Sequence, residues 1–200
     1  MIYIVFAIIA AYLLGSVPTG YIFGRIVKNV DIREHGSGNV GATNVFRTVG
    51  KVPGLMVLVL DFMKGLLAVT VIPLCLRNIS PSGMKFYVYI LLGSAAIAGH
   101  IWTVFLGFKG GKGVATTAGV MTGLSPGIFL ACLLIWIIVF VIWRYVSLAS
   151  IVTAMSLPVF AVLFNKDIFF ILFCSAFCLV GVHSHRSNIR RLIQGREKKI

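Results

Sequence analysis

The polar side chains that could bind or react with a ligand occur mainly in four short stretches between long apolar runs. The first stretch, EHGSGNVGATNVFRTVGK at residues 34–51, mixes glycines with Ser37, Thr43, Asn44 and Arg47. Glycines let a backbone approach a ligand closely, and a guanidinium group forms a planar fork suited to phosphate. The composition therefore indicates a loop that binds an anion.

The second stretch is FKGGKGVATT at residues 108–117. It is not a P-loop, because that motif requires Ser or Thr directly after its lysine, and here Gly113 follows Lys112. The N–H groups at the start of a helix, together with a lysine, still form an anion site. Because a helix is expected to begin here, Gly110, Gly111 and Lys112 are candidate binding residues.

The other two stretches are RYVSLAS at 144–150 and HSHRSNIRR at 183–191. They contribute Ser150, and His185 with Asn188. Each stretch alone has a simpler explanation, because such loops are commonly turns, a serine can cap a helix, and basic residues beside membrane spans touch lipid headgroups. The four stretches together supply what is needed to bind one or two phosphates.

The composition indicates an integral membrane protein. The 200 residues are 59% hydrophobic and 12% charged, with a mean hydropathy of +1.02, whereas soluble domains are about 45–50% apolar and about 25% charged. A formal net charge of +13 on so apolar a chain favours anionic lipid or phosphate ligands over nucleic acid. With five acids and no clustered metal ligands, we expect neither a metal nor another cofactor.

The apolar runs predict an all-α fold with seven transmembrane helices in a single membrane domain, residues 1–200. A spanning helix needs about 20 apolar residues. The segment 113–124 is shorter, and joining it to the next run would give six spans instead. The predicted spans are 2–24, 52–76, 85–107, 113–124, 125–143, 147–164 and 167–183.

The positive charges favour seven spans. In that topology, the connections on one side hold 14 Lys and Arg residues, whereas those on the other side hold three, Arg77, Lys85 and Lys166. Lys and Arg concentrate on the cytoplasmic side of membrane proteins. We therefore expect the N-terminus outside, the C-terminus in the cytoplasm, and all four polar stretches on the cytoplasmic face.

Three ionisable residues fall well inside the predicted spans, away from their ends. Asp61 and Lys64 are three residues apart and can form a buried ion pair on one helix face. His100 is a functional candidate because ionisable groups in membrane spans are costly, although it could equally be neutral and hydrogen-bonded between helices.

The motifs resemble those of a known family. The segments GSGNVGATNVFRTVGK, GHIWTVFLGFKGGKGVAT and HRSNIRRL are similar, in order and spacing, to the three signature motifs of the bacterial acyl-phosphate-dependent glycerol-3-phosphate acyltransferases, the PlsY family. RYVSLAS resembles a further shared stretch. Members of this family are seven-span proteins of the bacterial inner membrane whose motifs face the cytoplasm.

The resemblance implies an activity and assigns residues to it. An acyl group would move from a fatty acyl-phosphate to the 1-hydroxyl of glycerol 3-phosphate, giving lysophosphatidate and phosphate, and a soluble enzyme would supply the acyl-phosphate. Thioester-using acyltransferases with a His-x4-Asp motif do not match, because no histidine here has that partner. The residues implicated are Ser37, Arg47, Lys112, Ser150, His185 and Asn188, and Ser187 departs from the Glu common in relatives.

Two questions stay open at this point. The base that accepts the proton of the hydroxyl could be His185 or a substrate phosphate. A carrier of an anionic phosphate compound, or a non-catalytic lipid-binding scaffold, could also use polar loops, although the chain shows no repeated halves.

The charge count makes a testable prediction about topology. Cysteines introduced in place of Lys109 and Lys199 should not react with an impermeant thiol reagent added outside intact cells, and should react once the membrane is opened. Labelling of either site from outside would contradict the seven-span topology.

Overall fold

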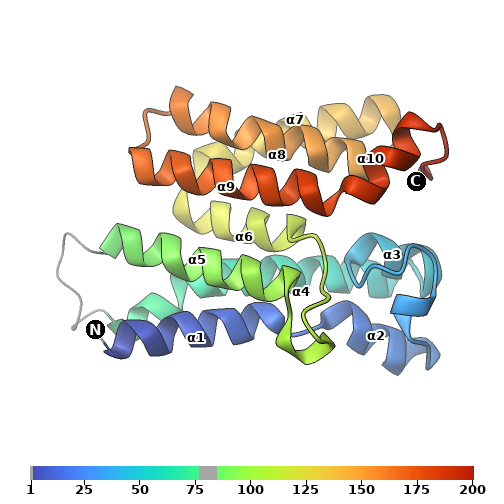
Figure 1. Ribbon diagram of the computed structural model, residues 1–200, viewed down its shortest axis with the longest axis horizontal. Helices are drawn as coiled ribbons and strands as arrows, with labels where there is room; N and C mark the ends of the chain where they lie inside the picture. Colours follow the sequence, from blue (N-terminus) through green and yellow to red (C-terminus); the bar gives the residue numbers. More distant parts are fainter. Residues whose placement is uncertain (1, 77–84) are drawn as a thin grey trace. The chain divides into compact units, whose positions relative to one another are not determined.

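The apolar runs of the sequence are helical, since a helix satisfies its own backbone hydrogen bonds and can therefore lie in lipid. The structure is a computed structural model that describes residues 2–76 and 85–200 (Figure 1). Arg77, which entered the charge count, lies outside the described residues. The contacts divide the chain into two compact units, unit 1 (Met1–Leu124) and unit 2 (Ser125–Ile200), and the single membrane domain stays a prediction.

The first apolar run is two helices rather than one. Helix α1 (Ile2–Ser16) ends before Val17 and Pro18, and α2 (Thr19–Lys28) continues in nearly the same direction (Figure 1). Proline lacks a backbone N–H, so it interrupts a helix and is tolerated at the start of the next one. The break exposes the carbonyl of Val17 for a partner outside the helix.

The remaining elements of unit 1 follow the predicted runs with short additions at their ends. Two short elements, η1 at the beginning of the first polar stretch and α3 within it, were not predicted, because this part of the sequence has no apolar periodicity. The elements are η1 (Ile32–Glu34), α3 (Ala42–Thr48), α4 (Lys51–Thr70), η2 (Ile72–Leu76), α5 (Lys85–Ile101), η4 (Val104–Leu106) and α6 (Val114–Leu124).

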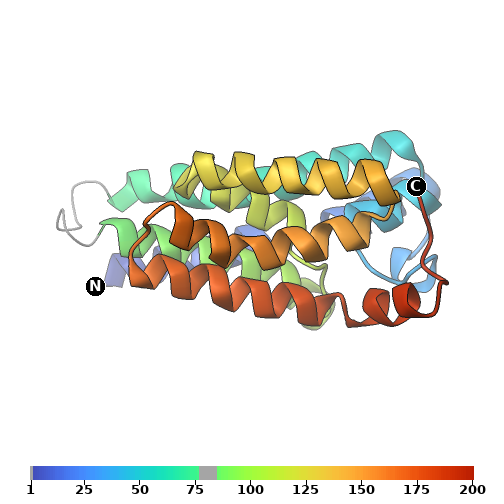
Figure 2. The same cartoon turned by 90° about the horizontal axis from the view of Figure 1, so that it is seen from above.

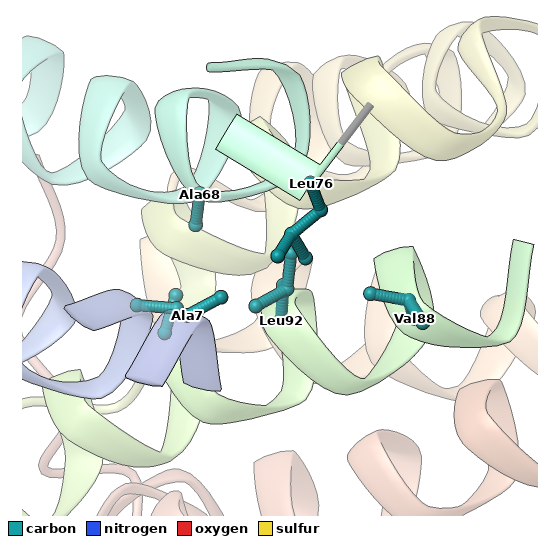
Figure 3. Packing of buried hydrophobic residues seen from close by; sticks show 7 residues of the cluster. Ala7, Ala68, Leu76, Val88 and Leu92 are labelled. Carbon is teal, nitrogen blue, oxygen red and sulfur yellow. The ribbon is translucent and has the colours of Figure 1, made fainter. Parts of the chain in front are cut away.

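The core of unit 1 lies where α1, α4 and α5 meet. Ala7 of α1, Ala68 of α4 and Leu92 of α5 are buried together with Leu76 and Val88 (Figure 3). Small residues at the crossings let the helices approach closely, as is common in membrane proteins. These contacts fix α5, whose last turn leads into the glycine-rich stretch.

A second buried cluster joins the first polar stretch to the second. Ile32, Val45 and Val57 are fully buried, and Leu106 of η4 packs against the cluster that they form. Leu106 lies just before the glycine-rich stretch. The same apolar cluster therefore anchors both the first polar stretch and the chain that leads into the second.

Unit 2 consists of α7 (Pro126–Trp143), α8 (Val146–Leu163), α9 (Ile168–Ser184) and α10 (Arg186–Ile193), with α8 packed between α7 and α9 (Figure 2). Leu130, Leu134, Ile137 and Val141 form an exposed apolar stripe along α7, as expected of a helix that faces lipid.

The helix lengths support membrane insertion in part. Among the described residues, five helical segments are long and apolar enough to cross a membrane when α1 and α2 are counted as one. The number is six when α9 and α10, bent by 57°, are also taken as one span. Helix α6 has only 11 residues. All seven predicted segments are helical, whereas the number of spans stays a prediction.

Candidate active site

Asn44 organises the first polar stretch from inside. Its Nδ2 donates to the carbonyls of Ile32 (3.2 Å) and His35 (2.9 Å), and its Oδ1 accepts from the N–H of Ser37 at 2.9 Å. A buried carboxamide bonded to three backbone groups fixes the loop around it. The structure thus gives Asn44 a structural role, and contact with a substrate stays a prediction.

The hydroxyl of Ser37 lies at an exposed point of this loop. Gly36 and Gly38 on either side have φ of +63° and +71°, values that glycine adopts readily and other residues rarely do. Thr43 is half-buried in α3, and Arg47 in its last turn is exposed. Ser37 and Arg47 therefore lie on the accessible side of the loop, whereas Asn44 holds its buried side.

Asp31 lies just before the first polar stretch and is bound by two arginines. Its carboxylate accepts hydrogen bonds from Nε of Arg33 at 2.9 Å and from Nη2 of Arg33 at 2.6 Å. Nη2 of Arg25 lies 3.4 Å from the same carboxylate. These hydrogen bonds from Arg33 hold the pKa of Asp31 at about 2, well below its ordinary value. Asp31 is consequently ionised at neutral pH and neutralises cations that flank the candidate site.

The glycine-rich stretch closes the end of α5. The N–H of Gly110 donates to the carbonyl of Ile101 at 2.9 Å, and that of Gly111 donates to His100 at 3.0 Å. The last carbonyls of a helix lack intrahelical partners, and these bonds satisfy two of them. The two N–H groups therefore face α5, and any contact of Gly110 or Gly111 with a ligand would come from close approach of their backbone.

Lys112 lies directly before α6, as the sequence predicted. Gly113 has a φ of +80°, and its carbonyl accepts from the N–H of Thr117 at 2.7 Å, which begins the helix. Lys112 is half-buried, whereas Lys109 is exposed. Lys112 therefore lies in the chain next to the first N–H groups of α6, and a lysine beside a helix start can stabilise negative charge.

In unit 2, His185 lies at the bend between α9 and α10. Its side chain is 2% exposed, and Nδ1 lies 2.8 Å from the carbonyl of Gly181. A carbonyl only accepts, so Nδ1 must carry the hydrogen, and Nε2 of the neutral ring is the basic nitrogen. His183 is exposed. The structure thus distinguishes the two histidines, and a role of His185 as a base stays a prediction.

Glu197, in the C-terminal tail, binds side chains of two helices. Its Oε1 accepts from Asn188 Nδ2 at 2.8 Å and from Ser147 Oγ at 3.0 Å, and its Oε2 accepts from Arg191 Nε at 2.7 Å. Burial alone would raise the pKa of Glu197, but these hydrogen bonds outweigh it and hold the pKa below its ordinary value. The carboxylate thereby ties the C-terminal tail to α8 and α10.

Ser150 is buried one turn along α8 from Ser147. Its Oγ donates to the carbonyl of Val146 at 2.8 Å and accepts from Trp136 Nε1 at 3.3 Å. The hydroxyl of Ser150 is thus held in place from both sides. Contact of Ser150 or of Asn188 with a substrate stays a prediction.

The candidate residues thus form two groups. Unit 1 holds Ser37, Thr43, Asn44, Arg47, Gly110, Gly111 and Lys112, and unit 2 holds Ser150, His185 and Asn188. The first group suits binding of anions, and the second provides a histidine with a basic nitrogen. The fold defines a helical membrane protein, and the first group has the residue types of an anion-binding site.

Comparisons with known proteins specify the family. The family description "Glycerol-3-phosphate acyltransferase" matches residues 5–195. A glycerol-3-phosphate acyltransferase of Desulforamulus reducens is 45% identical over 98% of this chain and 94% of its own, and one of Desulforudis audaxviator is 47% identical over 94% and 91%.

Two crystal structures are similar over nearly the whole fold. The integral membrane glycerol 3-phosphate acyltransferase PlsY (YgiH) in its glycerol 3-phosphate form has a TM-score of 0.88 at 39% identity, covering 98% of this chain and 95% of that one. Its lysophosphatidic acid form has a TM-score of 0.85 at 38% identity over the same shares. The chain belongs to the glycerol-3-phosphate acyltransferase family, and it is a multi-pass membrane acyltransferase.

Sequence reasoning missed Glu197 as a member of the second group. The C-terminal tail is basic, and its single acid gave no signal, because the partners of Glu197 lie up to 50 residues away in the chain. The fact that could have identified it is the scarcity of acids, since a lone carboxylate among cations is expected to be paired.

Replacing Glu197 should loosen the second group. Glu197→Gln leaves one oxygen for Asn188 but places an N–H2 against Arg191, and losing a hydrogen bond to a charged group costs about 1.5–3 kcal/mol. We expect a lower melting temperature in detergent at pH 7. Because the folded-state pKa of Glu197 is depressed, its contribution is present above the unfolded-state pKa and is lost as pH falls through the folded-state pKa.

The difference in melting temperature between wild type and Glu197→Gln should consequently become smaller as the pH is lowered. Glu34→Gln is the matched control, because Glu34 is exposed, and its melting temperature should follow wild type throughout. A pH-independent difference for Glu197→Gln would contradict the ionised hydrogen-bonded carboxylate.

Proposed function

We propose that the protein transfers a fatty acyl group from acyl-phosphate to the 1-hydroxyl of glycerol 3-phosphate, forming lysophosphatidate and inorganic phosphate. The observation that carries the proposal is the family match at residues 5–195, which includes all the candidate residues. The similar PlsY structures, described as a glycerol 3-phosphate form and a lysophosphatidic acid form, support the acceptor and the product.

The proposed donor follows from the chemistry of the side chains. An acyl-phosphate is a mixed anhydride with a good leaving group, so the reaction needs no covalent enzyme intermediate. Holding both substrates in the right orientation can by itself lower the barrier by about 7–11 kcal/mol. Cationic and glycine-rich loops suit two phosphorylated substrates, whereas the reacting carbon of a thioester donor carries no phosphate for these loops to bind.

In the proposed reaction, the 1-hydroxyl oxygen forms a bond to the acyl carbonyl carbon. The bond from that carbon to the phosphate oxygen breaks, and phosphate leaves with the electron pair. Nε2 of His185 accepts the proton of the hydroxyl, because Nδ1 is committed to the carbonyl of Gly181. Arg47 and Lys112 stabilise the negative charge on the phosphate groups and on the developing oxyanion.

The proposed setting is the bacterial inner membrane, with seven spans, the N-terminus outside and the candidate residues facing the cytoplasm. The distribution of Lys and Arg supports this orientation. Fatty acyl chains would lie among membrane lipids, and a soluble enzyme in the cytoplasm would supply the acyl-phosphate.

A purified system tests the reaction and its donor together. Protein in detergent should convert glycerol 3-phosphate and acyl-phosphate to lysophosphatidate without another protein, and acyl-CoA or acyl carrier protein thioester should give no product. His185→Ala, which removes the proposed base, should lower turnover by roughly 10²–10⁴-fold. Comparable turnover with a thioester would refute the proposed donor, and no turnover with any donor would refute the proposed function.

The two lysines of the glycine-rich stretch should contribute unequally. Lys112→Met removes a half-buried charge next to the start of α6, and losing one partner of a desolvated charge pair costs about 2–5 kcal/mol. We therefore expect Lys112→Met to abolish most of the transfer, measured as kcat/KM with each substrate varied in turn.

Lys109→Met is the matched control, because Lys109 is exposed three residues earlier in the same stretch. An exposed charge contributes about 0–1 kcal/mol and is screened by salt. Its small effect should therefore diminish at higher ionic strength. Equal losses in the two variants would show that the stretch acts as a unit.

A further inference from the structure

A group of ionisable side chains is buried directly behind the glycine-rich stretch. Asp61, Lys64 and His100 are 2%, 5% and 8% exposed. Lys64 Nζ lies 2.8 Å from Asp61 Oδ1 and 3.3 Å from His100 Nδ1. The sequence predicted the ion pair of Asp61 with Lys64, and the structure adds His100 to it. Together, these three residues form a buried triad.

The buried triad also contacts the segment that joins α1 to α2. The third contact of Lys64 Nζ is the carbonyl of Val17, at 3.0 Å, which the break between α1 and α2 exposes. Asp61 Oδ1 also accepts from Thr19 Oγ1 at 2.5 Å. An ammonium has three N–H donors, and each of them has an acceptor here. The triad therefore connects α4 to α5 and to the start of α2.

His100 extends this connection to the glycine-rich stretch. Lys64 only donates, so Nδ1 of His100 is the acceptor and the ring hydrogen lies on Nε2. Nε2 faces Gly111, where an added Cβ would collide with it, and the carbonyl of His100 accepts from the N–H of Gly111. The imidazole and the backbone of His100 thus support Gly111, the residue before Lys112.

The helix that carries the ion pair also supports the other side of Lys112. Gly65, next to Lys64 on α4, packs so closely on the carbonyl of Thr116 that a Cβ there would collide with it. Thr116 belongs to the first turn of α6. Two contacts therefore flank Lys112 in the chain. His100 of the triad makes the contact at Gly111, and Gly65, the neighbour of Lys64, makes the contact at Thr116.

Stability alone gives a poor account of the buried triad. Removing charges from water is costly, and well-packed apolar residues of similar size commonly stabilise a protein at least as well as a buried ion pair. An ion pair with fixed hydrogen bonds does, however, select one arrangement of the elements that it joins. Here the selected arrangement determines where Gly111 and the start of α6 lie.

We propose that Asp61, Lys64 and His100 are positioning residues that hold the Lys112 stretch in the geometry that binds glycerol 3-phosphate. They act through Gly111 and α6 and touch no substrate. The inference rests on the proposed function, because it assumes that Lys112 binds the phosphate of the acceptor. Its specific consequence is that loss of the triad weakens binding of the acceptor more than binding of the acyl donor.

A neutral replacement of the ion pair tests this consequence. Asp61→Asn with Lys64→Met removes both charges at once, so neither is left buried without its partner, and the introduced carboxamide oxygen can still accept from Thr19. The KM for glycerol 3-phosphate should rise about tenfold or more, equivalent to roughly 1.4 kcal/mol. The KM for acyl-phosphate and the melting temperature without substrate should stay close to wild type.

A binding measurement makes the test independent of turnover. A ligand that binds only the folded protein raises its melting temperature in proportion to RT ln(1 + [L]/Kd). Glycerol 3-phosphate should raise the melting temperature of wild type, and the double variant should need about tenfold more of it for the same shift. If wild type shows no shift and no turnover, the proposed function fails, and with it the premise of this inference.

Variants of His100 cover the case in which the double variant does not fold. His100→Asn keeps an acceptor near the position of Nδ1 for Lys64, whereas His100→Leu removes it. His100→Asn should therefore retain a lower KM for glycerol 3-phosphate than His100→Leu. Ser94→Ala is the control on the same helix, because the hydroxyl of Ser94 donates within α5, to the carbonyl of Ile90, and its kinetics should match wild type.

Two results would overturn the inference. One is an unchanged KM for glycerol 3-phosphate in the double variant and in both His100 variants. The other is a rise in the KM for both substrates together with a fall in kcat and in melting temperature. That result would show that the triad supports the fold as a whole and not the Lys112 stretch in particular.

Discussion

The end of α5 depends on two hydrogen bonds, from the N–H groups of Gly110 and Gly111 to the carbonyls of Ile101 and His100. A helix that ends among apolar residues must find donors for its last carbonyls, because little water is available there. The chain supplies them by folding back on itself, and only glycine fits against His100 at Gly111. This requirement places Lys112 just before α6, so the closure of α5 helps to position the lysine that precedes the next helix.

The two buried histidines show how a hydrogen-bond partner selects the chemistry of an imidazole. His185 donates through Nδ1 to the carbonyl of Gly181, which leaves Nε2 as the basic nitrogen. His100 instead accepts at Nδ1 from Lys64, which places its hydrogen on Nε2. The first arrangement suits proton transfer, whereas the second suits a fixed support. Sequence alone marked both histidines as candidates, and their partners separate the roles.

The sequence predicted where the helices lie in the chain better than it predicted which way their polar groups point. The segments predicted from the apolar runs are helical, and the helix expected after Lys112 begins at Val114. The pattern could not show that Asn44 points into its loop, or that the N–H groups of Gly110 and Gly111 face α5, because those contacts depend on tertiary packing. The partners of Glu197 were equally hidden, since they come from α8 and α10.

The scarcity of acids connects the architecture to its ligands. Of the five acids, Asp31, Asp61 and Glu197 each pair with basic side chains, and Asp167 accepts from two N–H groups at the start of α9. These carboxylates are therefore already used to hold loops and helix ends. With 18 Lys and Arg residues against five acids, the chain cannot neutralise its own positive charge. Phosphorylated compounds and anionic lipid headgroups are anions that occur at a membrane surface, so this excess of positive charge favours ligands of that kind.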